Sequence, residues 1–328
     1  MRKLEIMKIS NLVSKYNLGN TLDLEILNSS QNTVYKVTTD KGIYVIKEYS
    51  KDAISNYYYL KKRKEQIRIS EILNDNNIKT IIPISYNNRR FIFYEDNYYL
   101  IYNYVTDKVR DSNEIDINNI KTLALIQSKI HKLNIKTSLP CSYKYIDIDL
   151  DKQLRIAYKV NKELYKKLDS FKNELSMIID NCNKYYKKMR NNLCVSHNDY
   201  KLLNILWNDD TPILIDFDAT GLANPTCCLC ESAFTFSNYK SYINYDFYYE
   251  YLKSYLSNYG KINEDFMEAM YVSFNGKLQW LKYMFSKNHL KKNNYIDGTI
   301  SMIDELMLYY YNIDKFNDIY KKIINELK

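Results

Sequence analysis

Apolar and polar residues alternate in short segments over the first third of the chain, and this pattern predicts strands. Turn-forming residues separate the segments, and the last segment is interrupted by a turn at 95–97. A helix is expected before the first strand, and a longer one at 53–74. The pattern therefore predicts a small antiparallel sheet of five strands with one main helix. The expected strands are residues 22–27, 33–38, 43–49, 81–86 and 91–105.

From about residue 116 the apolar period becomes helical. Leu123, Ile126 and Ile130, for example, fall on one face of a helix. Short strands are expected again within 192–217, after which the chain reads as helical to its end. The change of period predicts an α+β fold with a boundary near 102–107. We expect an N-terminal lobe at 1–105 and a larger, mainly helical lobe at 106–328.

Composition narrows the class of protein. The 328 residues suit one large domain or two lobes that share a cleft, and 46% hydrophobic content is too high for a disordered chain. The first residues do not resemble a signal peptide, and no segment approaches the roughly 20 apolar residues of a membrane span. We therefore expect a cytoplasmic protein without a membrane partner. The net charge of +8 is compatible with a nucleotide or phosphate partner, but no nucleic-acid-binding motif is present.

The six cysteines do not form a disulfide framework at this length. Cys227, Cys228 and Cys230 are close in sequence, but a zinc site needs four ligands with wider spacing. We expect these three residues to be buried thiols at the start of a helix.

The segment that carries chemistry lies at 195–218. Asp199 falls in a polar loop between apolar runs, Asn204 follows five residues later, and Asp216 ends a predicted strand. A tight turn at 208–211 would return the chain, so that Asp216 can lie close to Asn204. A few oxygen ligands of this kind suit Mg²⁺, and a separate carboxylate can orient an acceptor hydroxyl in phosphoryl transfer. Each acid alone would be ordinary for a loop or a strand end, so the inference depends on the ordered set.

The pattern His197-x-Asp199-x4-Asn204, followed by Asp-Phe-Asp at 216–218, resembles the catalytic and metal-binding loops of the kinase-like superfamily. It is most similar to the aminoglycoside phosphotransferase and choline kinase branch. The resemblance implies a bilobal kinase-like fold and an ATP- or GTP-dependent and Mg²⁺-dependent O-phosphotransferase. It assigns Asp199 as the catalytic base, Asn204 and Asp216 as Mg²⁺ ligands, and His197 as a structural residue of the loop.

The resemblance also suggests residues on the nucleotide side. Lys47 ends an Ile-Tyr-Val-Ile-Lys run that matches the context of the lysine on the α- and β-phosphates. Its partner would be a glutamate on the following helix, where Glu65 fits the spacing better than Glu71. Lys201 would stabilise the transferring phosphate as a second catalytic residue. Asp218 stands where many small-molecule kinases carry a second acid.

The loop expected to cover the phosphates, 27–32, contains no glycine. Ser29 and Ser30 are candidates there, because their hydroxyls and backbone amides can donate to phosphate. Asn103 and Tyr104 lie in a segment that resembles the hinge, where backbone groups would pair with the nucleotide base.

The acceptor remains open between an aminoglycoside, choline or another amino alcohol, a sugar and a metabolite hydroxyl. Acids would favour an aminoglycoside, whereas an aromatic box would favour a quaternary ammonium group. No obligate protein partner is evident. The candidates on the C-terminal helices are Glu231, Asp246, Glu250, Glu264, Asp265, Glu268, Trp280, Tyr283 and Phe285.

Two other functions compete with a small-molecule kinase. A protein kinase is disfavoured, because Asp218 replaces the glycine of Asp-Phe-Gly and the glycine-rich loop is missing. A non-catalytic structural protein with the kinase fold, such as a spore-coat protein, is disfavoured because Asp199, Asn204 and Asp216 are all present.

Overall fold

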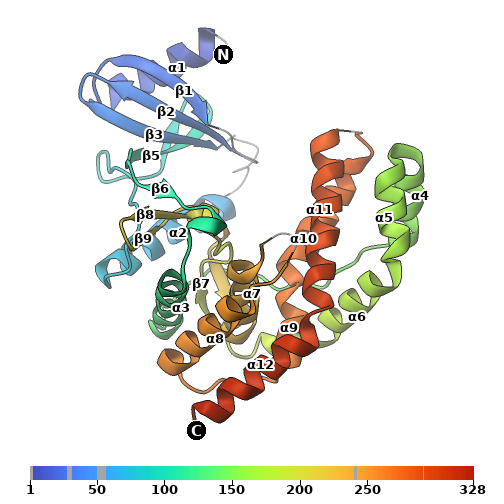
Figure 1. The fold of residues 1–328 in the computed structure, drawn as a ribbon. Helices are drawn as coiled ribbons and strands as arrows, with labels where there is room; N and C mark the ends of the chain where they lie inside the picture. Colours follow the sequence, from blue (N-terminus) through green and yellow to red (C-terminus); the bar gives the residue numbers. More distant parts are fainter. Residues whose placement is uncertain (1–2, 28–31, 50–56, 240–241, 291) are drawn as a thin grey trace. The chain divides into compact units, whose positions relative to one another are not determined.

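The structure is a computed structural model in which the chain forms two compact units (Figure 1). The expected N-terminal lobe at 1–105 and mainly helical lobe at 106–328 remain predictions. The compact units differ from those ranges mainly because the segment 205–218 packs with the first unit. The first unit consists of Met1–Val109 and Ile205–Asp218, and the second of Arg110–Asn204 and Ala219–Lys328. The described residues are 3–27, 32–49, 57–239, 242–290 and 292–328.

The first unit contains a five-stranded antiparallel sheet in the order β1-β2-β3-β5-β4 (Figure 1). This confirms the predicted five-stranded sheet, with one helix before the first strand and a longer helix between the third and fourth strands of the chain. The helices are α1 (Lys3–Lys15) and α2 (Tyr57–Asp75). The strands are β1 (Thr21–Leu27), β2 (Thr33–Thr39), β3 (Gly42–Tyr49), β4 (Ile92–Tyr94) and β5 (Asn97–Asn103).

One predicted strand, 81–86, is wrong, and a different pair of strands completes the sheet. The segment makes a main-chain bond of 2.6 Å from Ile84 to β5 but forms no strand, and Pro83 in its middle has no N–H to donate to a ladder. Instead, Glu95 and Asp96 turn the chain with φ of 42° and 63°, and the expected strand 91–105 becomes the hairpin of β4 and β5.

The larger of two buried clusters in this unit lies between α1 and one face of the sheet, and the smaller one contains Tyr49, Phe91 and Leu100. Ile9, Leu12 and Val13 of α1 are buried in one cluster with side chains of β2, β3 and β5. Ile46 of β3 belongs to this cluster. Because successive side chains of a strand point to opposite faces, Lys47 projects to the other face of the sheet.

A second, three-stranded sheet in the order β6-β8-β9 also belongs to the first unit. Its strands are β6 (Lys108–Val109), β8 (Ile205–Asn208) and β9 (Thr211–Leu214). Asn208 pairs with Thr211, and Asp209 between them has φ of 48°. The predicted tight turn at 208–211 is therefore present.

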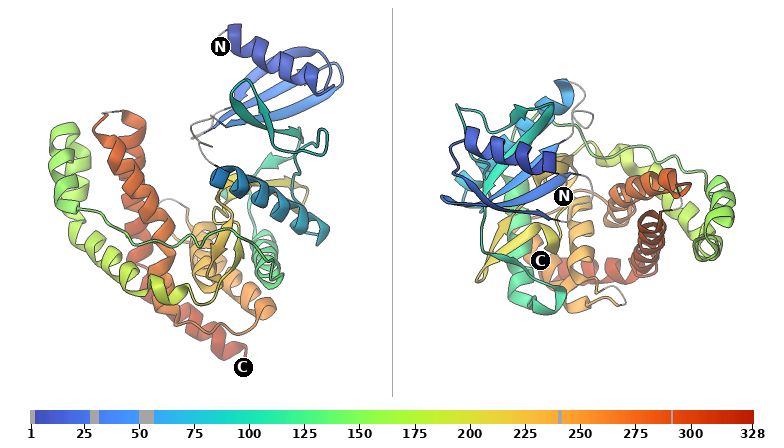
Figure 2. Two further views of the ribbon diagram at one scale, coloured as in Figure 1. Left: turned by 180° about the vertical axis from the view of Figure 1, so that it is seen from behind. Right: turned by 90° about the horizontal axis from the view of Figure 1, so that it is seen from above.

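The second unit is mainly helical, and its two short strands, β7 (Cys194–Ser196) and β10 (Gly221–Ala223), pair antiparallel. The α4–α5 pair lies beside the α10–α11 pair (Figure 2). No helix in the described ranges is long and apolar enough to cross a membrane. The helices are α3 (Ile117–Lys132), α4 (Leu150–Val160), α5 (Lys162–Ser170), α6 (Lys172–Met189), α7 (Pro225–Ser237), α8 (Tyr245–Tyr259), α9 (Phe266–Ser273), α10 (Asn275–Asn288), α11 (Asn293–Tyr310) and α12 (Ile313–Glu326).

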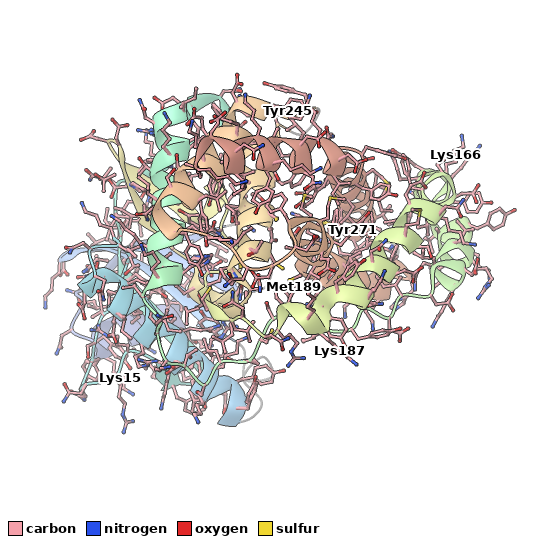
Figure 3. The ribbon with its side chains drawn as sticks, turned by 90° about the horizontal axis from the view of Figure 1, so that it is seen from below. Lys15, Lys166, Lys187, Met189, Tyr245 and Tyr271 are labelled. Carbon is pink, nitrogen blue, oxygen red and sulfur yellow. The ribbon has the colours of Figure 1, made fainter. Side chains whose placement is uncertain are left out.

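Helix α7 is buried along most of its length, and its first turn is fixed by Asn224. The side-chain oxygen of Asn224 accepts from the N–H groups of Thr226 at 2.9 Å and Cys227 at 3.2 Å, which caps the helix. Its amide nitrogen donates to the carbonyl of Met189 at 3.2 Å. Met189 is the last residue of α6 (Figure 3). Further along α7, Phe234 stacks on Tyr309 of α11 with ring centroids 4.3 Å apart.

Candidate active site

The loop after β7 brings three predicted site residues of the second unit together. Asn198 turns the loop with φ of 58°, a conformation that Asn tolerates better than most residues. Asn204 then donates its amide nitrogen to both the main-chain oxygen of Asp199, at 2.8 Å, and its carboxylate Oδ2, at 2.7 Å. The Nζ of Lys201 lies 2.8 Å from the other carboxylate oxygen of Asp199.

His197 is buried beneath this loop. Its ring lies 6.2 Å from that of Tyr200, whose hydroxyl donates to the carbonyl of Leu123 at 3.0 Å. The buried ring and the anchored neighbour hold the loop against α3. The structural role of His197 remains a prediction.

The first unit holds a second cluster of charge, around Lys47. The Nζ of Lys47 lies 2.7 Å from Oδ1 of Asp216 and 2.8 Å from Oδ2 of Asp218. Burial by itself would lower the pKa of Lys47, but the charges of Asp218 and Asp216 outweigh burial and raise that pKa. Burial would likewise raise the pKa of Asp218, but Lys47 and Arg63 outweigh burial and lower it.

The expected ion pair between Lys47 and a glutamate of α2 does not form among the described residues. Glu65 is instead bound to Arg68, with distances of 2.9 and 2.6 Å, and Glu71 is bound to Arg90. The physical reason is that α2 presents a different face to Lys47. Arg63 and its neighbour one turn later, Gln66, face the 216–218 segment and bind Asp218.

The oxygen atoms that remain available fit a hard cation. The amide nitrogen of Asn204 is used as a donor, and its oxygen accepts no hydrogen bond within the described ranges. Asp216 has a φ of 60°, and its side chain is 41% exposed. Among the described residues, its carboxylate is bound by Lys47 alone. An amide oxygen and a carboxylate suit Mg²⁺, which takes its remaining ligands from water and phosphate. Asn204 and Asp216 belong to different units, so their approach to one another remains a prediction.

Of the other residues predicted to contact the nucleotide, only some lie within the described part of the chain. Ser29 and Ser30 lie outside the described residues. Asn103 ends β5 and lines a hollow of about 610 Å³ in the first unit. Tyr104 follows it, with the Nζ of Lys36 4.9 Å from the ring centroid. Their contact with a base remains a prediction.

Charged groups of α7, α10 and α11 interact electrostatically with one another, and Glu231 and Lys277 also interact with Asp199. The Nζ of Lys277 lies 2.8 Å from Oε1 of Glu305. Burial raises the pKa of Glu231 to about 7, and although Lys277 opposes this shift, the charge of Asp199 adds to it. Sequence reasoning considered Glu231 but missed Lys277 and Glu305. A signal was present, because Lys277 stands four residues before the buried Leu281, on the apolar face of α10.

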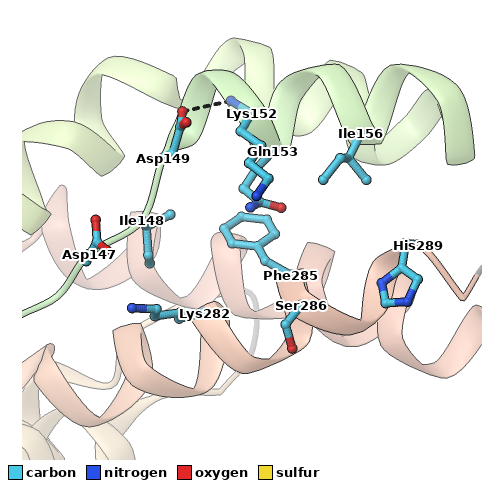
Figure 4. A pocket seen from close by; sticks show the side chains of 10 residues that line it. All are labelled: Asp147, Ile148, Asp149, Lys152, Gln153, Ile156, Lys282, Phe285, Ser286 and His289. Atoms are coloured by element: carbon cyan, nitrogen blue, oxygen red, sulfur yellow. Dashed lines mark hydrogen bonds between the residues drawn. The ribbon is translucent and has the colours of Figure 1, made fainter.

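The three aromatic candidates of α10 do not form a single box. Trp280 and Tyr283 stack with centroids 5.0 Å apart and are both exposed. Phe285 instead lines a cavity of about 530 Å³ between α10 and the start of α4, where it points toward Gln153 (Figure 4).

The cysteines of α7 are buried free thiols at the start of the helix, as predicted. Burial raises the pKa of Cys227, Cys228 and Cys230. They are therefore poor nucleophiles and pack as small apolar side chains.

Comparison with known proteins identifies the family. Among solved structures, spectinomycin phosphotransferase APH(9)-Ia in complex with ADP and spectinomycin has a TM-score of 0.67 and 14% identity, over 92% of this chain and 98% of that one. The amicoumacin kinase hAmiN in complex with AMP-PNP, Ca²⁺ and Ami has a TM-score of 0.60 and 13% identity, over 96% of both chains. Choline kinase LicA from Streptococcus pneumoniae has a TM-score of 0.58 and 14% identity, over 92% of this chain and 99% of that one.

These likenesses confirm the predicted kinase-like fold. A search of the curated proteins finds no match. The sequence profile described as the phosphotransferase enzyme family matches residues 23–231, which is more than half of the chain and includes the Asp199 loop and the charged residues around Lys47. The chain belongs to the phosphotransferase enzyme family.

Proposed function

We propose that this member of the phosphotransferase enzyme family transfers the γ-phosphoryl group of ATP or GTP, with Mg²⁺, to a hydroxyl group of a small molecule. The observation that carries the proposal is the arrangement of Asp199 and its two neighbours. Asn204 fixes the carboxylate of Asp199 from one side, and Lys201 places a cation against its other oxygen. A carboxylate held in this way can accept a proton from a hydroxyl group as that oxygen attacks phosphorus.

Each residue has a separate task in this reaction. Asp199 orients the acceptor hydroxyl and accepts its proton, and Lys201 neutralises charge on the transferring group. Lys47 holds the phosphates of the nucleotide. Asn204 and Asp216 would hold Mg²⁺, which neutralises phosphate charge when it is bound.

The charges near Asp199 favour an acceptor that carries an amino group. Glu231 and Glu305 provide two carboxylates against the single ammonium group of Lys277. When Glu231 is ionised, this group of three side chains is net negative and would attract a cation. One neighbour of the same fold was solved with spectinomycin and another is named as a choline kinase, which supports a hydroxylated amine as the acceptor class.

The test is transfer of labelled phosphate from ATP or GTP to a library of hydroxylated amines, antibiotics and sugars. We expect Asp199→Asn to lower turnover about 10²- to 10⁴-fold without changing the melting temperature by more than a few degrees, because a positioned base contributes on this scale. Asp210→Asn, in the exposed turn between β8 and β9, is the matched control. Equal turnover in Asp199→Asn and the wild type would refute the assignment. A wild-type chain that binds no nucleotide would favour a structural role for the fold.

A further inference from the structure

Asp218 contacts several elements of the first unit, and a second acid beside Asp216 would not need these contacts. Its side chain meets residues from the loop before β2, from β3 and from α2. Its main-chain oxygen also accepts from Arg63 at 3.0 Å and from Gln66 at 2.8 Å. The donors to its carboxylate are Asn32 Nδ2 at 3.2 Å, Lys47 Nζ at 2.8 Å, Tyr49 Oη at 2.8 Å and Arg63 Nη1 at 3.0 Å.

The hydrogen-bonding capacity of the two acids separates their tasks. A carboxylate has about four acceptor sites, and the donors to Asp218 occupy that number. Asp216 receives Lys47 alone from the described residues, at Oδ1, and its side chain is 41% exposed against 25% for Asp218. Asp216 therefore has oxygen sites left for a cation, whereas Asp218 has none.

Lys47 depends on these same two acids. Within the described part of the chain its ion pairs are to Asp216 and Asp218, and α2 offers it no carboxylate. When a divalent cation takes Asp216, only Asp218 can keep the ammonium group of Lys47 in place.

We propose that Asp218 is the permanent counter-ion of Lys47, a positioning residue that takes the part expected of a glutamate on α2. Arg63 and Gln66 of α2 act on Lys47 indirectly, by fixing Asp218. The inference rests on the proposed function, because it concerns the lysine and the cation site that would hold a nucleotide. Without the charge of Asp218, Lys47 pairs with Asp216 alone and competes there with the cation.

The test is calorimetric binding of AMP-PNP at a series of Mg²⁺ concentrations. We expect Asp218→Asn to weaken AMP-PNP binding about tenfold and to raise the Mg²⁺ concentration for half-maximal binding, since Lys47 is no longer pre-positioned and blocks Asp216. Asp216→Asn should instead make AMP-PNP binding insensitive to Mg²⁺. Asp210→Asn, which changes the same charge in the exposed turn, should behave as the wild type.

Two results would overturn the proposal. Loss of the Mg²⁺ dependence in Asp218→Asn, as in Asp216→Asn, would make Asp218 a cation ligand. A larger loss of AMP-PNP affinity in Glu65→Gln than in Asp218→Asn would show that Glu65 of α2, and not Asp218, is the counter-ion of Lys47.

Two further measurements keep this inference separate from the proposed function. The first is a double-mutant cycle with Lys47→Met and Asp218→Asn, measured by urea unfolding without nucleotide. We expect the effects of the two substitutions on the unfolding midpoint to be coupled, and purely additive effects would refute the ion pair. This test remains valid even if the wild type binds no AMP-PNP, a result that would refute the proposed function instead.

If Asp218→Asn does not fold, a crystal structure of the wild type with Mn²⁺ and AMP-PNP tests the proposal. Mn²⁺ on Asp216 with Lys47 still on Asp218 supports the proposal, and Mn²⁺ on Asp218 refutes it.

Discussion

Glu231 is a carboxyl group that folding moves toward its neutral form. Lys277, Asp199, Glu305 and Lys201 face it, and burial is the largest influence on its pKa, which rises from 4.5 to about 7. Between these two values the unfolded chain has lost the proton and the folded chain still holds it. The contribution of Glu231 to stability therefore falls as pH rises through this window.

We expect Glu231→Gln to remove this pH dependence. Relative to the wild type, the variant should gain stability between about pH 5 and about pH 8, by no more than about 3 kcal/mol. Urea unfolding of both proteins at the two pH values measures the difference. Parallel changes with pH in the two proteins would contradict the raised pKa.

Gly19 and Gly260 form a matched pair of glycines with positive φ, +103° and +98°. A methyl group at Gly19 would lie 2.1 Å from Oδ1 of Asp40, which is itself fixed by two hydrogen bonds from Asn20. A methyl group at Gly260 would meet nothing within 4 Å. We expect Gly260→Ala to cost about 1–3 kcal/mol of unfolding free energy from backbone strain alone.

Gly19→Ala adds overlap to strain, and we expect it to cost at least about 1 kcal/mol more than Gly260→Ala. Denaturant unfolding of the two variants measures both values. Equal losses would show that the turn at Asp40 relaxes without cost.

Single residues also mark the limit of what the sequence predicts. A spaced motif or a strand context singles out Lys47, Asp199, Lys201 and Asn204, and their roles remain predictions. Arg63 was not found, because its partner Asp218 is 155 residues away and only the fold joins them. A helix presents charged residues on several faces, and propensity does not say which face meets the sheet.

At the scale of elements, the sheet was predicted and one strand was misassigned. The apolar run at 81–86 has strand-like composition, but strand formation depends on hydrogen bonds to a neighbour, and Pro83 removes a donor. The hairpin of β4 and β5 depends on Glu95 and Asp96 adopting positive φ, which sequence permits without requiring. The sequence predicts that the second unit is mainly helical, because the helical spacing of apolar residues can be read from neighbouring positions in the chain.

The first turn of α7 depends on Asn224 in two ways. Its oxygen caps the helix, and its nitrogen donates to the carbonyls of Met189 and Asn192 and to Oε1 of Glu264. We expect Asn224→Ala to lower the free energy of unfolding by about 3 kcal/mol, because a cap and buried hydrogen bonds are lost together.

Asn224→Asp separates the two contributions. It keeps the capping oxygen but places a second carboxylate beside Glu264 and removes the donors. We expect the Asp variant to be destabilised as well, as measured by thermal unfolding. Wild-type stability in Asn224→Asp would mean that only the cap matters.

At the scale of the whole molecule, the thiols report how completely the chain is folded. All six cysteines are free, and Cys141 is half-buried while the other five are buried. We expect iodoacetamide to label Cys141 in the native protein and the remaining thiols only after unfolding. Mass spectrometry of labelled peptides measures this, with Cys141→Ser as the control. Rapid labelling of Cys227 or Cys230 in the native protein would contradict the packing of α7.

The order in which the two units can be completed follows from their connectivity. Asp216 and Asp218, the acids that hold Lys47, are made after the whole stretch from Arg110 to Asn204. At about 10 residues per second, the ribosome takes on the order of ten seconds to cross that stretch. During this time the nascent β6 has no partner strand, and Lys47 has no counter-ion. The first unit therefore cannot be completed before Asp218 is made, and at that point the second unit still lacks Ala219–Lys328.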